Sequence, residues 1–181
     1  MKKNLLLALI SIFPLCTFAQ SFSQKEVATY CNGRLAYSIQ YPKNLLFPQN
    51  EPANGDGIKI MSKDAEAILH LYGRNNSLND SLLDLFLSES SGGTSKNPKK
   101  VVTYKVLKED WFVVSGFDSG KVFYTKTFLL NEQFKTFHFS YPESQRKIFD
   151  PVTKLLASSF NGDVKVTMKK EEKFVTLTCN L

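Results

Sequence analysis

Four extended runs between residues 101 and 141 constrain the fold more than any other feature of the sequence. They span 101–108, 111–117, 121–130 and 134–141, and only two or three turn-forming residues separate each run from the next. Connections this short join neighbouring antiparallel strands, because a parallel pair needs a crossover of a dozen or more residues. The sequence therefore predicts a meander of antiparallel strands.

The side-chain pattern within the strands indicates which faces are buried. In the last run, Phe137, Phe139 and Tyr141 point to one side and alternate with Thr136, His138 and Ser140. The earlier run 66–73 is apolar on both sides, with Ala67, Leu69 and Leu71 facing one way and Ile68, His70 and Tyr72 the other. This second pattern is typical of a central strand in a sheet that is covered on both faces.

Two amphipathic helices are available to cover such a sheet. The first is expected at 79–90, after Asn79-Asp80-Ser81, whose short polar side chains cap free backbone amides. The second is expected at 143–160 and divided into two pieces, because Asp150-Pro151 combines a capping carboxylate with a proline suited to a first helical turn. The prediction is an α+β fold, an α/β/α sandwich with a mainly antiparallel sheet flanked by helices.

Strand-like segments are also predicted near both ends of the chain. Residues 27–31 and 34–41 form a hairpin, for which Asn32-Gly33 suits a type I′ turn. A long polar excursion follows at 42–57 and is expected to leave a cleft above the sheet. Two further strands at 164–168 and 174–179 form a C-terminal extension, residues 163–181.

The first nineteen residues predict export. Lys2 and Lys3 precede a short apolar segment, and Ala19 provides a small residue before the cleavage point. A signal peptide at 1–19 leaves residues 20–181 as a single domain in the periplasm or outside a bacterial cell. Cys16 leaves lipidation open as an alternative, although Phe13-Pro14-Leu15 lacks the usual small residue before a lipidated cysteine.

Cys31 and Cys179 are the two cysteines that remain after cleavage. In an oxidising compartment such a pair favours a disulfide bond, and two separate buried thiols are the alternative. Both cysteines lie in strand-like segments that can run side by side. We expect the bond to close nearly the whole mature chain.

Several segments of the sequence, in the order in which they occur, resemble segments of PsbP-like proteins. These are the segment 30–42, which ends in Tyr41-Pro42, the paired segments 111–116 and 122–124, and the segment 141–160. PsbP-like proteins belong to a superfamily of α/β/α sandwiches that includes a Ran-binding nuclear import factor. The resemblance implies this fold and a mostly non-enzymatic accessory or assembly role.

No group of residues in the sequence forms a recognisable catalytic or metal motif. His70 and His138 can approach each other across the sheet, but no HxH, HxxxH or CxxC spacing accompanies them. Ser115 lacks the preceding glycine of a nucleophile elbow. Asn54-Gly55-Asp56-Gly57 resembles part of a calcium loop without its later acidic ligands, so a turn is predicted and a weak cation site is the alternative. The sequence predicts no catalytic, cofactor-binding or metal-binding residues.

Charge argues against a nucleic-acid partner. The net charge of +6 falls to +4 when Lys2 and Lys3 leave with the signal peptide, and the densest basic cluster comprises Lys96, Lys99, Lys100, Lys105 and Lys108. This cluster is typical of a solvated loop and an edge strand.

The first functional hypothesis is an exported, non-enzymatic binding or accessory module that contacts an envelope protein or a small hydrophobic ligand. The alternatives are an envelope enzyme that uses His70 or His138, and a purely structural subunit. The enzyme hypothesis requires both histidines and an acidic residue in one pocket.

Overall fold

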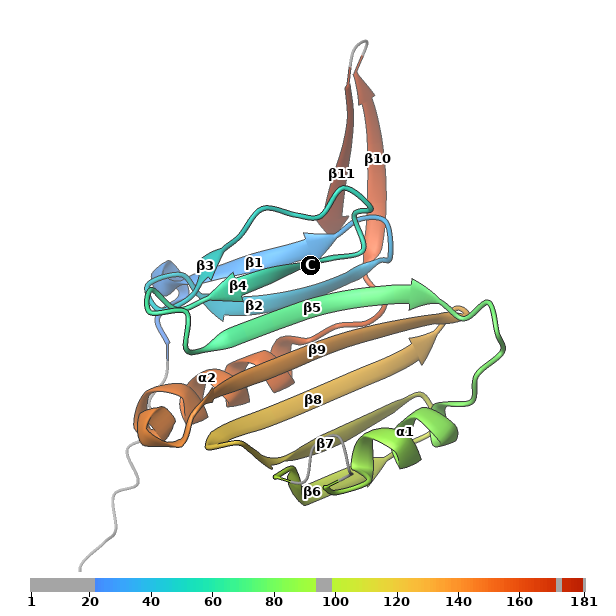
Figure 1. Cartoon of the computed structure of the whole chain (residues 1–181). Helices are drawn as coiled ribbons and strands as arrows, with labels where there is room; N and C mark the ends of the chain where they lie inside the picture. Colours follow the sequence, from blue (N-terminus) through green and yellow to red (C-terminus); the bar gives the residue numbers. More distant parts are fainter. Residues whose placement is uncertain (1–21, 94–98, 172–173, 181) are drawn as a thin grey trace, which may run out of the picture.

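The structure, a computed structural model, describes residues 22–93, 99–171 and 174–180. Its centre is an antiparallel sheet of seven strands in the order β3-β4-β5-β9-β8-β7-β6 (Figure 1). The strands are β3 (Phe47–Pro48), β4 (Gly57–Met61), β5 (Ile68–Asn75), β6 (Val101–Leu107), β7 (Trp111–Asp118), β8 (Lys121–Leu130) and β9 (Gln133–Pro142). The predicted meander is confirmed as β6 to β9, and β5 pairs with β9 to continue the sheet.

One face of the sheet, which we call the α2 face, carries the main core. Helix α2 (Arg146–Ser159) and a separate hairpin of β1 (Val27–Asn32) and β2 (Tyr37–Pro42) cover this face. The buried core includes Tyr37, Ile39, Leu69, Leu71, Phe137, Phe139, Phe149 and Phe160. The alternation predicted for β9 is therefore confirmed, because Phe137, Phe139 and Tyr141 all face this core.

The opposite side, the α1 face, is covered over only part of its width. Helix α1 (Leu82–Ser90) packs on β6 and β7, and its core consists of Leu82, Phe112, Val114, Phe123 and Phe134. A helix of nine residues is about 13 Å long, which is too short to cover seven strands spaced about 4.8 Å apart. The prediction that 66–73 is covered on both faces is thus wrong for this side, where Tyr72 remains 37% exposed.

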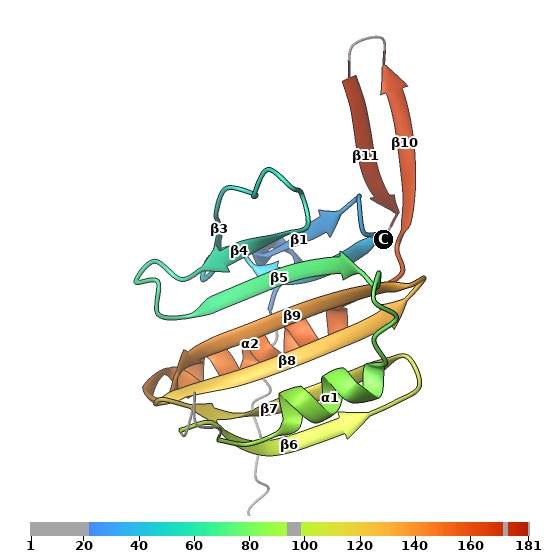
Figure 2. The same cartoon turned by 45° about the vertical axis from the view of Figure 1, so that its right-hand side comes forward.

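The start of α1 follows the predicted capping. The Ser81 hydroxyl accepts a hydrogen bond from the Asp84 backbone N–H at 3.0 Å, so the helix begins just after the predicted polar triplet. The two helices lie on opposite faces of the sheet (Figures 1 and 2), which confirms the sandwich architecture.

The predicted division of the second helix is wrong. A short 3-10 turn (Glu143–Gln145) precedes α2, and the helix then continues through Pro151. The Asp150 carboxylate does not cap a helix, because it accepts hydrogen bonds from the Tyr141 hydroxyl at 2.7 Å and from Arg146 at 3.2 Å. Pro151 cannot donate a backbone hydrogen bond within the helix, and burial of the next residue, Val152, offsets this loss.

The predicted type I′ turn at Asn32-Gly33 is also wrong. Asn32 is the last residue of β1 and pairs with Tyr37, so residues 33–36 form a four-residue loop. The Asn32 side-chain oxygen accepts a hydrogen bond from the Leu35 backbone N–H at 2.9 Å, and Ala36 takes the left-handed conformation at φ 52°. This side-chain hydrogen bond and the burial of Leu35 outweigh the preference of the Asn-Gly dipeptide for a two-residue turn.

The C-terminal extension forms its own two-stranded sheet, β10 (Lys165–Glu171) and β11 (Phe174–Asn180). Figure 2 shows this hairpin extending away from the seven-stranded sheet, and β11 contacts β1. The predicted signal peptide and Cys16 lie outside the described residues. Within the described part of the chain, none of the helices has the length and apolar character needed to cross a bilayer.

Candidate functional site

A row of four polar side chains crosses the α1 face from the sheet edge towards α1. Lys59 on β4 pairs with His70 on β5, His70 pairs with His138 on β9, and His138 pairs with Thr125 on β8. Directly paired residues point to the same face with Cβ atoms about 4.5–5.5 Å apart. We call these four residues the polar ladder.

A second polar row runs beside the ladder. Tyr72 on β5 pairs with Thr136 on β9, and Thr136 pairs with Thr127 on β8. The hydroxyls of Thr127 and Thr136 lie 2.9 Å apart and form a buried hydrogen bond. The middle of the α1 face is therefore polar and internally hydrogen-bonded, while the α2 face of the same strands is aromatic.

His138 is the most enclosed member of the ladder. Its Nδ1 lies 2.8 Å from the Thr125 hydroxyl, and its ring stacks on Phe123 with centroids 6.2 Å apart. Burial lowers the pKa of His138, and Lys100 and His70 lower it further, while Glu89 and Asp118 act in the opposite direction. At neutral pH His138 is therefore a neutral imidazole held in place by its neighbours.

A lysine joins α1 to the sheet near His138. Lys100 Nζ donates a hydrogen bond to the Glu89 backbone oxygen at 2.8 Å and lies 3.6 Å from the Glu89 carboxylate. It also lies 5.3 Å from the centroid of the Phe123 ring. These contacts fix the C-terminal end of α1 over the inner end of the ladder.

His70 occupies the middle of the ladder and is more accessible. Its ring lies 4.8 Å from that of Tyr72. Partial burial lowers the pKa of His70, the positive charge of Lys59 lowers it further, and the more weakly acting Asp56 raises it. His70 is thus also neutral near pH 7, with a cation directly across the strand pair.

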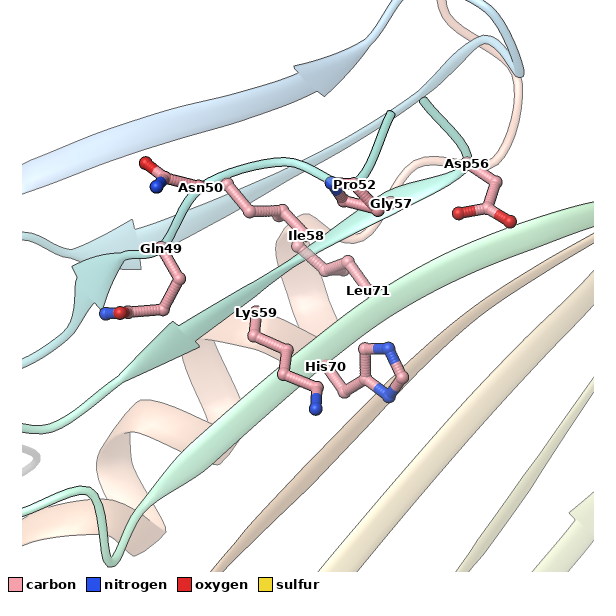
Figure 3. Close-up of a pocket in the computed structure, with 9 residues that line it drawn as sticks. All are labelled: Gln49, Asn50, Pro52, Asp56, Gly57, Ile58, Lys59, His70 and Leu71. Carbon is pink, nitrogen blue, oxygen red and sulfur yellow. The ribbon is translucent and has the colours of Figure 1, made fainter. Parts of the chain in front are cut away.

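A cavity of about 400 Å³, which we call the edge cavity, opens beside His70 (Figure 3). It is lined by Gln49, Asn50, Pro52, Asp56, Gly57, Ile58, Lys59, His70 and Leu71. The Gln49 N–H donates a hydrogen bond to the Lys59 carbonyl at 2.8 Å, and beyond Gln49 the chain leaves the edge of β4. The cavity forms because the chain rejoins the sheet only at Asp56. The cleft expected from the 42–57 excursion is confirmed in this form.

The β1–β2 hairpin holds the outer wall of the edge cavity. The Asn32 side-chain amide donates to the Gly55 carbonyl at 3.0 Å, and the Tyr37 hydroxyl donates to the Asp56 carbonyl at 3.1 Å. The Arg34 guanidinium donates to the Asn54 carbonyl. Burial raises the pKa of Tyr37, so its hydroxyl stays protonated as a donor. These contacts keep the wall open without a ligand.

The structure brings the two histidines together but does not complete a catalytic or metal site with them. His70 lines the edge cavity together with Asp56, whereas His138 is not among the residues that line it. Within the described ranges, no group of three His, Cys, Asp or Glu side chains is arranged to hold a metal ion. In the Asn54–Gly57 turn, the Asp56 carboxylate accepts a hydrogen bond from the Asn54 amide at 2.7 Å.

The predicted pairing of Cys31 with Cys179 remains a prediction. Cys31 lies on β1 opposite Ser38 and is disulfide-bonded. Cys179 lies on β11, where the backbone is described and the side chain falls outside the described part. The contact between β1 and β11 is compatible with the predicted bond.

The sequence pattern missed Lys59 and Thr125 as parts of the site. Alternation along β9 correctly placed His138 opposite the aromatic core. The sequence pattern does not contain the register of β4 against β5 or of β8 against β9, and these registers align the four ladder residues. The signal available in the sequence was a lysine, Lys59, between the apolar residues Ile58 and Ile60 on a short strand that follows a long polar excursion.

Comparison with known proteins identifies the fold. No protein-family model matches the sequence, and no curated protein matches it. The chain is similar to the solution structure of cyanobacterial PsbP (CyanoP) from Synechocystis sp. PCC 6803, with a TM-score of 0.54 and 12% sequence identity. The match covers 78% of this chain and 97% of the cyanobacterial one. The chain therefore has the PsbP-like fold that its sequence resembles.

Proposed function

We propose that the protein is an exported, non-enzymatic binding module of the cell envelope and that it holds a small ligand in the edge cavity. The observation that carries this proposal is the cavity itself, whose volume of about 400 Å³ falls within the range typical of small-molecule sites. It lies between the sheet edge and a loop anchored from behind, so it needs no rearrangement to accept a ligand.

Preorganisation supports binding as the role of this region. Backbone carbonyls at residues 54, 55 and 56 each accept a hydrogen bond from a side chain of the β1–β2 hairpin. A wall fixed in this way costs little further conformational entropy when a ligand binds. A loop with only a connecting role would not need three separate anchors.

The geometry favours binding over catalysis. An acid–base mechanism needs a titratable pair that reaches one substrate. In the ladder, the inner histidine is engaged by Thr125, and only the outer histidine opens into the cavity. The fold itself is neutral on this question, since one fold hosts many functions.

The lining also limits the kind of ligand. Pro52 offers apolar surface, while Gln49, Asn50, Lys59 and His70 supply polar groups around it. This combination suits a small molecule with an apolar body better than a broad protein surface. A protein partner remains the alternative occupant of the same edge.

Binding is tested by native mass spectrometry and ligand-observed NMR on the purified exported protein, against a library of small amphipathic molecules. Asn50→Trp places an indole at the exposed mouth of the cavity and is expected to abolish binding. Glu109→Trp, in the turn between β6 and β7, adds the same side chain far from the cavity and is expected to retain it. Equal binding by both variants would place the ligand elsewhere.

Export is tested on the same preparation. Intact-mass analysis is expected to show a chain that begins at Gln20 and lacks two hydrogen atoms, which corresponds to cleavage after Ala19 and one bond between Cys31 and Cys179. Retention of Met1, a lipid on Cys16, or two free thiols in the denatured protein would each contradict the corresponding part of the proposal.

A further inference from the structure

We propose that the ligand of the edge cavity carries a carboxylate group, and that this group binds between Lys59 Nζ and the imidazole of His70. This inference rests on the proposed function and adds the chemical class of the ligand. It is carried by the outer half of the polar ladder, where a cation and an imidazole project from adjacent strands into one cavity.

The two side chains are placed to share one anionic group. Lys59 and His70 are direct partners in the β4–β5 register, and both line the edge cavity. Figure 3 shows them extending from adjacent strands on the same side of the sheet. A carboxylate has two oxygens, so it can accept a hydrogen bond from each side chain at once.

Lys59 has no acidic partner among the described side chains. The salt bridges there join Arg74 to Asp80, Lys100 to Glu89, Lys121 to Glu66 and Arg146 to Asp150. Lys59 instead lies opposite His70 and lowers its pKa. An anion bound between the two would accept hydrogen bonds from both side chains and would favour protonation of His70.

The charges of the cavity lining disfavour a dianion. Asp56 lines the same cavity, and its field already acts on His70. A dianionic phosphate would be repelled by Asp56 while facing one lysine and a neutral imidazole. A carboxylate carries a single charge, so Asp56 repels it less than a dianion while it still faces Lys59.

The rest of the cavity accommodates an apolar body behind the carboxylate. Pro52 lies on the loop beside Gly57, away from the Lys59–His70 pair, and offers apolar surface there (Figure 3). A short alkyl or aromatic acid would therefore place its charged end at the ladder and its apolar part against the β4 edge.

Three probes of equal chain length test the inference: hexanoate, hexanamide and hexyl phosphate. Each is titrated into the isotope-labelled exported protein, and the amide signals of Asn50 and Gly57 report occupancy. Hexanoate is expected to bind about tenfold more tightly than hexanamide, as a charge-assisted hydrogen bond of about 1.5 kcal/mol requires. It should also raise the pKa of His70, measured from the imidazole proton shift, and bind more tightly than hexyl phosphate.

Lys59→Met is the decisive variant, because it keeps the aliphatic stem and removes the charge. It is expected to abolish the preference for hexanoate over hexanamide while leaving binding of the amide intact. Lys105→Met, on the exposed face of β6, is the matched control and should behave as the unmodified protein.

The outcomes separate this inference from the proposed function. Equal binding of hexanoate and hexanamide in the cavity would overturn the carboxylate and leave the binding function standing, and so would a preference for hexyl phosphate. No change in the Asn50 and Gly57 signals with any probe would overturn the carboxylate inference, while binding of another library compound that Asn50→Trp abolishes would still support the function.

Discussion

The two faces of the central sheet use the same strands for different purposes. On β9, Phe137 is fully buried in the aromatic core of the α2 face, while the next residue, His138, belongs to the polar ladder of the α1 face. On β5, Leu71 is buried and its neighbours His70 and Tyr72 are not. The period of two along each strand thus separates the aromatic core of the α2 face from the polar ladder, of which Lys59 and His70 line the edge cavity.

The two faces should therefore respond differently to substitution. The α2 face is a closed set of interlocking rings, such as Phe160, which contacts Tyr37, Phe128 and Phe137 edge-on or tilted. Beyond the small core under α1, the α1 face consists of hydrogen-bonded polar pairs beside a cavity. Changes in the first should cost stability, and changes in the second should alter binding or its dependence on pH.

The largest expected effect tests this division on adjacent residues. Phe137→Ala removes a fully buried ring and is expected to lower the free energy of unfolding by about 3–5 kcal/mol. His138→Ala removes one hydrogen bond to Thr125 and is expected to cost about 1 kcal/mol. Urea denaturation followed by far-UV circular dichroism measures both. Equal losses would mean that both faces are equally structural.

Lys135 is an apparent exception to the division and provides the second test. It lies on β9, is fully buried, and donates from Nζ to the Gly162 carbonyl just after α2. Burial lowers the pKa of Lys135. Lys135→Met fills nearly the same volume but leaves the carbonyl without its donor, so we expect a loss of about 1–3 kcal/mol in the free energy of unfolding.

A second lysine is the matched control for this variant. Lys126 on β8 donates to the Ala157 carbonyl at 3.3 Å from a less buried position. Lys126→Met should cost less than Lys135→Met, because water can replace its hydrogen bond. The reverse order would show that burial does not determine the cost of polar groups on the α2 face.

The third test uses pH, because both histidines of the chain lie on the α1 face. The folded-state pKa of each is lowered, by burial first, so the unfolded chain binds protons more readily. Stability should therefore fall as pH decreases through about 6.5, the unfolded value, and level off below the folded pKa values. His70→Gln/His138→Gln should flatten the dependence of the urea midpoint between about pH 7.5 and 5. An unchanged slope would assign that dependence to other groups.

Local sequence rules predicted the elements of this fold well. Short turns and alternating residues are local signals, so the four strands of the meander and the start of α1 at Ser81 could be read from the sequence. The PsbP-like architecture was predicted from the same turn-forming residues and from the resemblance of several segments to PsbP-like proteins. The division at Asp150-Pro151 failed because the Asp150 carboxylate binds the Tyr141 hydroxyl, at the end of β9, instead of capping a helix.

The candidate site depended on information that the sequence pattern does not contain. His70 and His138 are far apart in the chain and become neighbours only through the β5–β9 register. Lys59 joins them through a second register, and the cavity depends on hairpin side chains that hold residues 54–56. A shift of one residue in either pairing would move the ladder to different faces. The sequence therefore identified the two histidines and their approach across the sheet, but not Lys59 and Thr125.

The smallest expected effect tests whether the second polar row is structural. Thr127→Val/Thr136→Val removes both hydroxyls of the buried pair at once, so no donor or acceptor of that pair is left unsatisfied, and a change near zero is expected in the free energy of unfolding. Tyr72, which also bonds Thr136, is exposed enough to bond water instead. Thr125→Val is the contrasting control, since it leaves His138 Nδ1 without its partner and should cost about 1 kcal/mol. If the double variant costs more than the single one, the threonine pair contributes to the stability of the α1 face beyond its own hydrogen bond, and the polar rows there would be structural rather than available for binding.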